Sequence, residues 1–231
     1  MVLKDILNNV LSQSGFIEKD TFTSAADIDD KQMISIANRV AYEIKNYFMW
    51  PELSKSNEVT LIEGVLRYKL PDDFQDFVPD SAWETDGSRQ VEWPTPNNRW
   101  YMYKFSTLSD GGVYRVKKYG NEIELYDVQG GAKFSYEYIS KWVVKNEQGG
   151  LKESFTDDAD SFILDDQLLV LGIQAHWQQA KQMPSYAEHF GNYDRKLSEA
   201  IGRSSSARTI GGYRRPNINC RSPYTPLYLR G

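Results

Sequence analysis

The chain has 231 residues, of which 40% are hydrophobic and 26% are charged, so it can bury a substantial core and is not disordered throughout. Its longest apolar run, residues 168–173, is far shorter than the roughly 20 residues that cross a bilayer, and Asp5 interrupts the stretch that a secretory signal would need. Neither a membrane span nor a signal peptide is expected, and the single Cys220 excludes an internal disulfide framework and a cysteine-rich zinc site. The net charge is −5, but residues 203–231 hold six arginines and no acid, which leaves −11 on the preceding residues.

Two helices are predicted near the N-terminus from apolar residues at helical spacing. Gly15 is suited to end the first, Asp27 or Asp29 to cap the second, and Pro51 to stop it. The apolar positions are Leu3, Ile6, Leu7, Val10 and Leu11 in the first helix and Met33, Ala37, Val40, Ala41, Ile44 and Phe48 in the second.

From about Ser54 apolar residues alternate with polar ones, which predicts strands of a small sheet or barrel. Gly120-Asn121 and Gly130-Gly131 are predicted hairpin turns, and residues 92–98, with two prolines and two asparagines, are predicted to form a long loop. The alternating positions are Leu66, Tyr68, Leu70, Tyr114, Val116, Ile123, Leu125, Phe134, Tyr136 and Tyr138.

Helical spacing returns after Gly149-Gly150 and predicts two further helices, separated by Pro184. Ser185 and Glu188 have the spacing of a capping box at the start of the last helix, which is predicted to end at Gly202. The apolar positions are Leu164, Leu168, Leu171 and Ala175, then Tyr186, Phe190, Tyr193, Leu197 and Ile201.

This order predicts an α+β fold: an antiparallel helical bundle from both chain ends, with an inserted small β-domain and an extended C-terminal tail. The predicted segments are 1–53 for the N-terminal helices and 54–150 for the β-domain. Residues 151–202 supply the C-terminal helices, and residues 203–231 are the basic and aromatic tail.

No constellation of residues favours catalysis, a cofactor or a metal, so none is nominated and the chain is not expected to be an enzyme. The densest acidic cluster contains Asp157, Asp158, Asp160, Asp165 and Asp166, which does not have EF-hand spacing and is better explained by capping of the following helix. His176 and His189 lack a second ligand at metal-binding spacing, so a structural role is favoured for each.

An aromatic cluster and the tail are the candidate contact sites. Trp83, Trp93, Trp100 and Tyr101 are predicted to contact a tail partner or a neighbouring subunit, although the same residues would suit the core of the β-domain. Few basic residues accompany them, which favours a protein contact over nucleic acid.

The tail combines arginines, prolines and aromatic residues, and its composition favours docking in an extended form on a protein over general solvation or DNA binding. Its nominated docking residues are Tyr213, Arg214, Arg215, Arg221, Tyr224, Leu227, Tyr228 and Arg230.

Three segments of the chain resemble parts of one known family of proteins. Residues 155–172, followed by Trp177, Gln179, Lys181, Tyr186 and Tyr193, resemble the C-terminal helical hairpin of head-to-tail adaptor (connector) proteins of tailed bacteriophages. Residues 68–74 resemble the segment that leads into the inserted β-domain of these proteins, and residues 136–142 the strand that leaves it.

The resemblance implies a structural protein of the virion neck, assembled in the host bacterial cytoplasm. It implies a homo-oligomer, a twelvefold ring below the portal protein, that extends the DNA channel and contacts the next tail component, which is a nozzle, hub or tail tube. The tail would dock on the portal, and DNA would pass without sequence-specific binding and without a membrane contact.

Two other classes remain open at this stage. A virion-associated hydrolase of cell-wall glycan would need paired carboxylates, but Glu52, Glu63, Asp72 and Asp73 are too scattered in the sequence to nominate a pair. A DNA-binding accessory protein would use the tail arginines.

Overall fold

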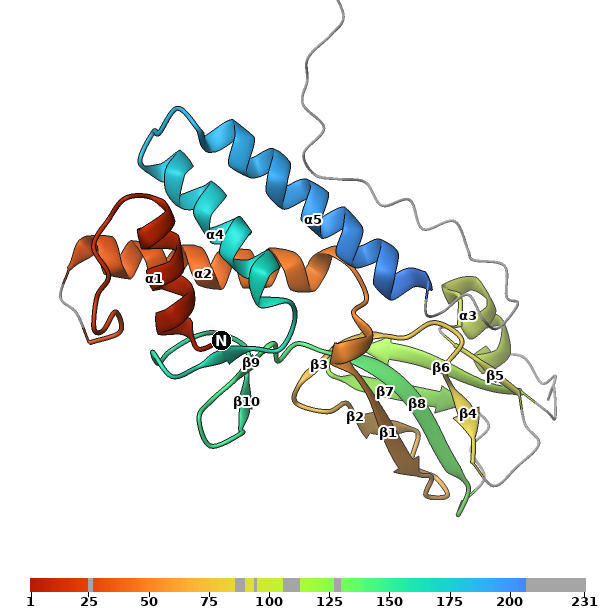
Figure 1. The fold of residues 1–231 in the computed structure, drawn as a ribbon. Helices are drawn as coiled ribbons and strands as arrows, with labels where there is room; N and C mark the ends of the chain where they lie inside the picture. The colour runs from red at the N-terminus through yellow and green to blue at the C-terminus, as the bar shows by residue number, and fades with distance from the viewer. Residues whose placement is uncertain (25–26, 86–89, 94, 106–112, 127–129, 207–231) are drawn as a thin grey trace, which may run out of the picture.

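The computed structural model describes residues 1–24, 27–85, 90–93, 95–105, 113–126 and 130–206 of the chain (Figure 1). Four of the helices gather at one end of the molecule and two larger sheets at the other. Within the described residues, no helix has both the length and the apolarity that a membrane span requires.

Both predicted N-terminal helices are confirmed. Helix α1 spans Leu3–Gln13, helix α2 spans Ile28–Tyr47, and all five apolar positions predicted for the first helix are buried. Asp27 is the N-cap of α2, where its carboxylate accepts a hydrogen bond from the amide of Asp29. After α2 the chain forms the short 3-10 helix η1 over Pro51–Leu53 and enters the first strand.

Gly15 ends α1 with a left-handed backbone, at φ +78°. The amides of Gly15 and Phe16 donate to the carbonyls of Ser12 and Leu11, which is the Schellman arrangement. We expect Gly15→Ala to lower the free energy of unfolding by about 1 kcal/mol, because a Cβ has open space here but strains this φ. Equilibrium unfolding in urea measures the change, and an unaltered midpoint would contradict the expectation.

Eight strands in the middle of the chain form two four-stranded sheets. In the first sheet β8 pairs with β1, β3 and β4, and the second has the order β2-β7-β6-β5. Only β5 and β6 run parallel; the other pairs in these two sheets are antiparallel. The bounds are β1 Ser54–Thr60, β2 Arg67–Lys69, β3 Phe74–Phe77, β4 Trp83–Glu84, β5 Gln90–Glu92, β6 Val113–Tyr119, β7 Glu122–Tyr126 and β8 Lys133–Ser140.

The two sheets enclose a core of their own that is rich in aromatic residues. Every second residue of β8 enters it, namely Phe134, Tyr136 and Tyr138, and the alternating residues of β6 and β7 meet them from the other sheet. The strands predicted from alternation are therefore confirmed, and the two sheets form a sandwich with two opposite outer faces.

Three local predictions in this region have different outcomes. Gly120-Asn121 is the turn between β6 and β7, as predicted, with φ +57° at Gly120. Gly130-Gly131 precedes β8, which belongs to the other sheet from β7, so the prediction of a hairpin turn there is wrong. The predicted loop of residues 92–98 is also wrong at its end, because helix α3 spans Asn97–Phe105.

The chain ends its described part with two helices, α4 over Asp166–Ala180 and α5 over Tyr186–Ser206. Gly202 lies inside α5, so the predicted end of this helix is wrong. The hydroxyl of Ser185 donates to Oε1 of Gln178 and ties the start of α5 to α4, in place of the predicted capping box.

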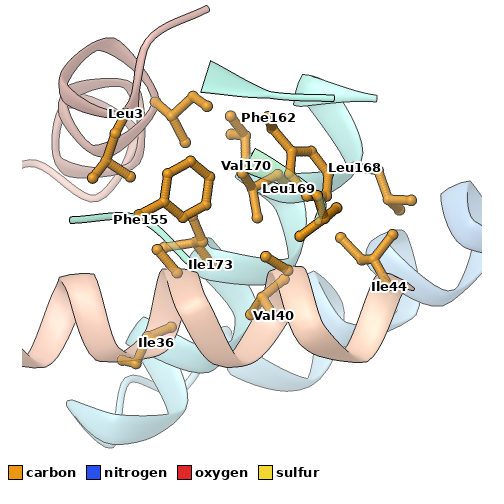
Figure 2. Packing of buried hydrophobic residues seen from close by; sticks show 14 of the residues in the cluster. Leu3, Ile36, Val40, Ile44, Phe155, Phe162, Leu168, Leu169, Val170 and Ile173 are labelled. Atoms are coloured by element: carbon orange, nitrogen blue, oxygen red, sulfur yellow. The ribbon is translucent and has the colours of Figure 1, made fainter. Parts of the chain in front are cut away.

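A third, three-stranded sheet adjoins these helices and completes their core. It has the order β10-β9-β11, with β9 at Val144–Lys145, β10 at Leu151–Lys152 and β11 at Ser161–Phe162. Figure 2 shows Phe155 beside Leu3 of α1, and Phe162 nearer to Leu168 and Leu169 of α4. Both rings belong to the core that also contains Val40 of α2.

The prediction of an antiparallel helical bundle from both chain ends with one small inserted β-domain is wrong. The fold is α+β, but α4 contacts α1, α2 and α5, and strand residues share the core of these helices. Strands dominate the middle of the chain, in two sheets. The physical reason is that α4 is buried along most of its length, so the other helices surround it, and Phe155 and Phe162 fill space that a helical partner would fill in a bundle.

Candidate assembly surfaces

The four aromatic residues predicted to contact a partner fall into two groups. Trp93 and Trp100 are buried, whereas Trp83 and Tyr101 expose 42% and 48% of their surface. The first two therefore serve the interior, and only the second two are placed where another molecule can reach them.

Trp93 belongs to the core between the two large sheets. Its ring centroid lies 3.9 Å from that of Phe77 in an edge-to-face contact and 5.4 Å from that of Tyr136, nearly stacked. The sequence left open that these aromatic residues form the core of the β-domain, and for Trp93 this alternative is correct.

Trp100 anchors α3 on the outer face of the second sheet, beside a buried ion cluster. Glu124 on β7 is almost fully buried and pairs with Arg67 of β2 at 3.1 Å and with Lys104 of α3. Burial favours a raised pKa for Glu124, but the two cations outweigh it and hold the pKa below the ordinary 4.5. This pairing fixes the orientation of α3.

The opposite side of α3 carries an exposed apolar patch. Tyr101, Met102 and Phe105 expose 48%, 53% and 78% of their surface, and the rings of Tyr101 and Phe105 stack at 6.2 Å. Lys117 of β6 places its Nζ 4.2 Å from the centre of the Tyr101 ring, and its hydrogen bond lowers the pKa of this phenol. We call Tyr101, Met102, Lys104, Phe105 and Lys117 the α3 surface.

The first sheet exposes a different set on its own outer face. Ser135 of β8 pairs with Glu58 of β1 on one side and with Trp83 of β4 on the other, so these side chains share a face. Glu137 follows two residues later on that face, and the exposed Asp76 of β3 lies farther along it. We call Glu58, Asp76, Trp83 and Glu137 the acidic surface.

Within the described part of the chain, Lys133 is the cation that pairs with the acidic surface, 3.3 Å from Glu58. Nearer the helices this face is covered, because Ile139 belongs to the helical core. The α3 surface and the acidic surface thus lie on opposite outer faces of one sandwich and differ in the sign of their charge.

The acidic residues before α4 have structural roles. Asp165 is the N-cap of α4 and accepts from the amides of Gln167 and Leu168, which confirms capping for this residue. Asp158 instead accepts from the amides of Phe22 and of the next residue, and thereby ties the segment between α1 and α2 to the chain before α4. Among the described residues, no group of three or more His, Cys, Asp or Glu is arranged to hold a metal ion.

His176 links two helices from a buried position on α4. Its Nδ1 lies 2.7 Å from Nη2 of Arg39 and its Nε2 lies 3.1 Å from Oε2 of Glu43, both on α2. Because a guanidinium only donates, Nδ1 accepts, and Nε2 carries the hydrogen that is donated to Glu43. This is the structural role that the sequence favoured, while His189 is partly buried on α5.

The four acids considered for glycan hydrolysis are not assembled as a pair. Asp72 forms an exposed ion pair with Lys69, and the buried Asp73 is bound by Lys55, Tyr138 and Ser140. Glu52 lines a hollow of about 310 Å³ whose other walls include Leu53, Trp142 and Leu151. All eight nominated tail residues lie outside the described residues.

Sequence reasoning missed part of the α3 surface. Met102, Phe105 and Lys117 were not nominated, although Tyr101 and Phe105 have the i, i+4 spacing of one helix face. Lys117 carries no comparable signal, because only the packing of α3 on β6 brings it to Tyr101. The acidic surface was hidden because β1 is almost entirely polar.

Comparison with known proteins assigns no family: no protein-family model and no curated protein matches this chain. The two surfaces and the resemblance in the sequence are therefore the basis for proposing a function.

Proposed function

We propose that this chain is a structural head-to-tail adaptor of a tailed bacteriophage. Copies of it would form a ring below the portal protein, extend the DNA channel and receive the next tail component, whether nozzle, hub or tail tube. The C-terminal tail would dock on the portal. The role requires no catalysis and no cofactor, and it places the protein in the virion neck after assembly in the host cytoplasm.

The observation that supports this proposal best is the pair of surfaces on opposite faces of one sandwich. A subunit in a ring needs a different contact on each side, because each copy meets one neighbour with one surface and the other neighbour with another. The chain offers an apolar, basic surface on α3 and an acidic surface on the other sheet. The order of the three resembling segments supports the same assignment.

The charge distribution also suits a channel. Residues before the tail carry −11, and a wall of this sign would repel DNA during packaging and ejection. The tail has the opposite sign and would reach the portal with its arginines and tyrosines.

The test compares the full chain with a version that ends at Ser206, which retains all of α5. Each is mixed with portal rings, and light scattering on a sizing column measures the mass of the complex. We expect the full chain to join the rings and the shortened chain to remain free. If both join, the tail is not the anchor; if neither joins, the adaptor assignment is wrong.

A third variant separates the two kinds of tail residue. Tyr213, Tyr224 and Tyr228 are replaced by serine while every arginine is kept. Docking through apolar anchors predicts loss of portal binding, whereas binding through charge alone predicts that portal binding persists and falls with added salt.

A further inference from the structure

We propose that the α3 surface of one copy docks on the acidic surface of the next copy. This inference deepens the proposed function by naming the contact between neighbouring subunits, and it relies on that function only for closure into a ring.

The apolar part of the contact comes from α3. Tyr101, Met102 and Phe105 lie on a helix of nine residues whose opposite side is anchored by the buried Trp100. Because Trp100 holds the helix on the sheet, these three side chains are not required for that contact and can face another molecule. Burying three such side chains against a partner removes apolar surface from water, and aromatic residues and methionine are enriched in protein interfaces. Trp83 supplies an exposed aromatic ring on the receiving side.

The electrostatic part selects a second copy as the occupant. Lys117 adds a positive charge beside the apolar patch, and the pair Lys104 and Arg67 exceeds the charge of the single Glu124 between them. Counted over the described residues, the receiving surface has three carboxylates, Glu58, Asp76 and Glu137, against Lys133. The two surfaces are therefore complementary in sign.

The placement of the surfaces determines the kind of assembly. They lie on opposite outer faces of the sandwich, so a copy that uses its α3 surface keeps its acidic surface free for another copy. Such a contact is head-to-tail, and it generates a ring when the rotation between neighbours closes.

The experiment measures self-association of the full chain alone by sedimentation velocity over a wide concentration series. We expect the mass to rise with concentration for the unaltered chain, and Phe105→Ser to weaken association about tenfold. Ile17→Ser is the matched control, because Ile17 is 89% exposed and follows α1, a helix that lies at the other end of the molecule from α3 and β4 (Figure 1). A chain that stays monomeric throughout, or equal effects of the two variants, would overturn the proposal.

Charge reversal tests which surfaces meet. Lys117→Glu and Glu137→Lys should each weaken association, and the double variant should recover most of the loss because the signs are again opposite. Lys31→Glu, on the exposed side of α2, serves as the control for a change in net charge. Losses that add in the double variant would show that the two surfaces do not meet.

Two further outcomes separate this contact from its alternatives. If the α3 variants leave self-association unchanged and instead weaken binding of a short single-stranded DNA, the surface is a nucleic-acid contact and the proposal is wrong. If the chain self-associates through these surfaces but does not bind portal rings, the contact stands and the proposed function fails.

Discussion

Replacing Gly172 with alanine is expected to lower the free energy of unfolding by about 1–3 kcal/mol, although alanine is the better helix former. Gly172 lies inside α4, where α2 and α5 approach it from two sides. A Cβ at this position would lie 2.4 Å from Cγ1 of Val40 and 2.9 Å from Cε2 of Tyr193. Both neighbours are buried, so relief requires the helices to move apart.

Gly191 on α5 provides the matched control for this substitution. A Cβ there meets nothing within 4 Å, so Gly191→Ala should raise stability by up to about 1 kcal/mol through helix propensity alone. Urea unfolding of both variants measures the opposite signs. A second variant, Gly172→Ala with Val40→Ala, should cost less than the two single changes together, because the smaller Val40 side chain makes room for the new methyl group.

The sequence predicted those elements whose residues repeat with a clear period. Leu3 to Leu11 repeat at helical spacing with Gly15 at the end, and Phe134, Tyr136 and Tyr138 alternate along β8; both patterns arise because one side of the element is buried. The apolar residues of both patterns are buried as predicted, and the Gly120-Asn121 turn connects β6 and β7.

Elements without such a period were missed or misjudged. Strand β1 is polar on its outer face and carries Lys55 and Asn57 on its inner one, so no apolar alternation marks it. Helix α3 follows Pro96, and its anchor Trp100 is buried without an apolar stripe around it in the sequence. The segment therefore resembles a loop in sequence. The predicted arrangement of the helices was wrong because an apolar stripe shows that a helix needs a packing partner but does not show which element that partner is.

The candidate surface shows the same limit. Tryptophan and tyrosine are common in contact sites, yet Trp93 and Trp100 are core residues. Residue type alone does not distinguish them from the exposed Trp83 and Tyr101. Burial depends on which strand passes behind each ring. The acidic surface depends on the pairing of β1 and β4 with β8, which register determines and sequence does not.

A buried carboxylate connects the first sheet with the loop before β3. Asp73 accepts hydrogen bonds from Lys55 at 2.6 Å, from the Tyr138 hydroxyl at 2.9 Å and from the Ser140 hydroxyl at 2.8 Å. Burial and the Asp73 carboxylate both raise the pKa of Tyr138, so this phenol stays protonated and donates. The cluster joins β1, β8 and the residues that precede β3.

We expect Asp73→Ala to lower the free energy of unfolding by about 2–4 kcal/mol, because it leaves three donors without their acceptor in a largely dry site. Asp72→Ala is the matched control: the neighbouring carboxylate is exposed, and its pair with Lys69 is solvated, so little change is expected. Thermal unfolding at neutral pH compares the two. Equal effects would mean that the hydrogen-bonded cluster contributes no more than the exposed pair.

The same carboxylate predicts how this contribution depends on pH. Burial alone would raise the pKa of Asp73, but the hydrogen bonds from Lys55, Ser140 and Tyr138 outweigh it and hold the pKa below the ordinary 3.8. The carboxylate therefore stabilises the fold fully above pH 3.8, and this stabilisation is lost as the pH falls from 3.8 through the lowered pKa. Other acids titrate in the same range, so the informative quantity is the difference in stability between the unaltered chain and Asp73→Asn. We expect this difference to be constant at neutral pH and to shrink below pH 3.8; a difference that grows on acidification would show that the folded state raises the pKa of Asp73 instead.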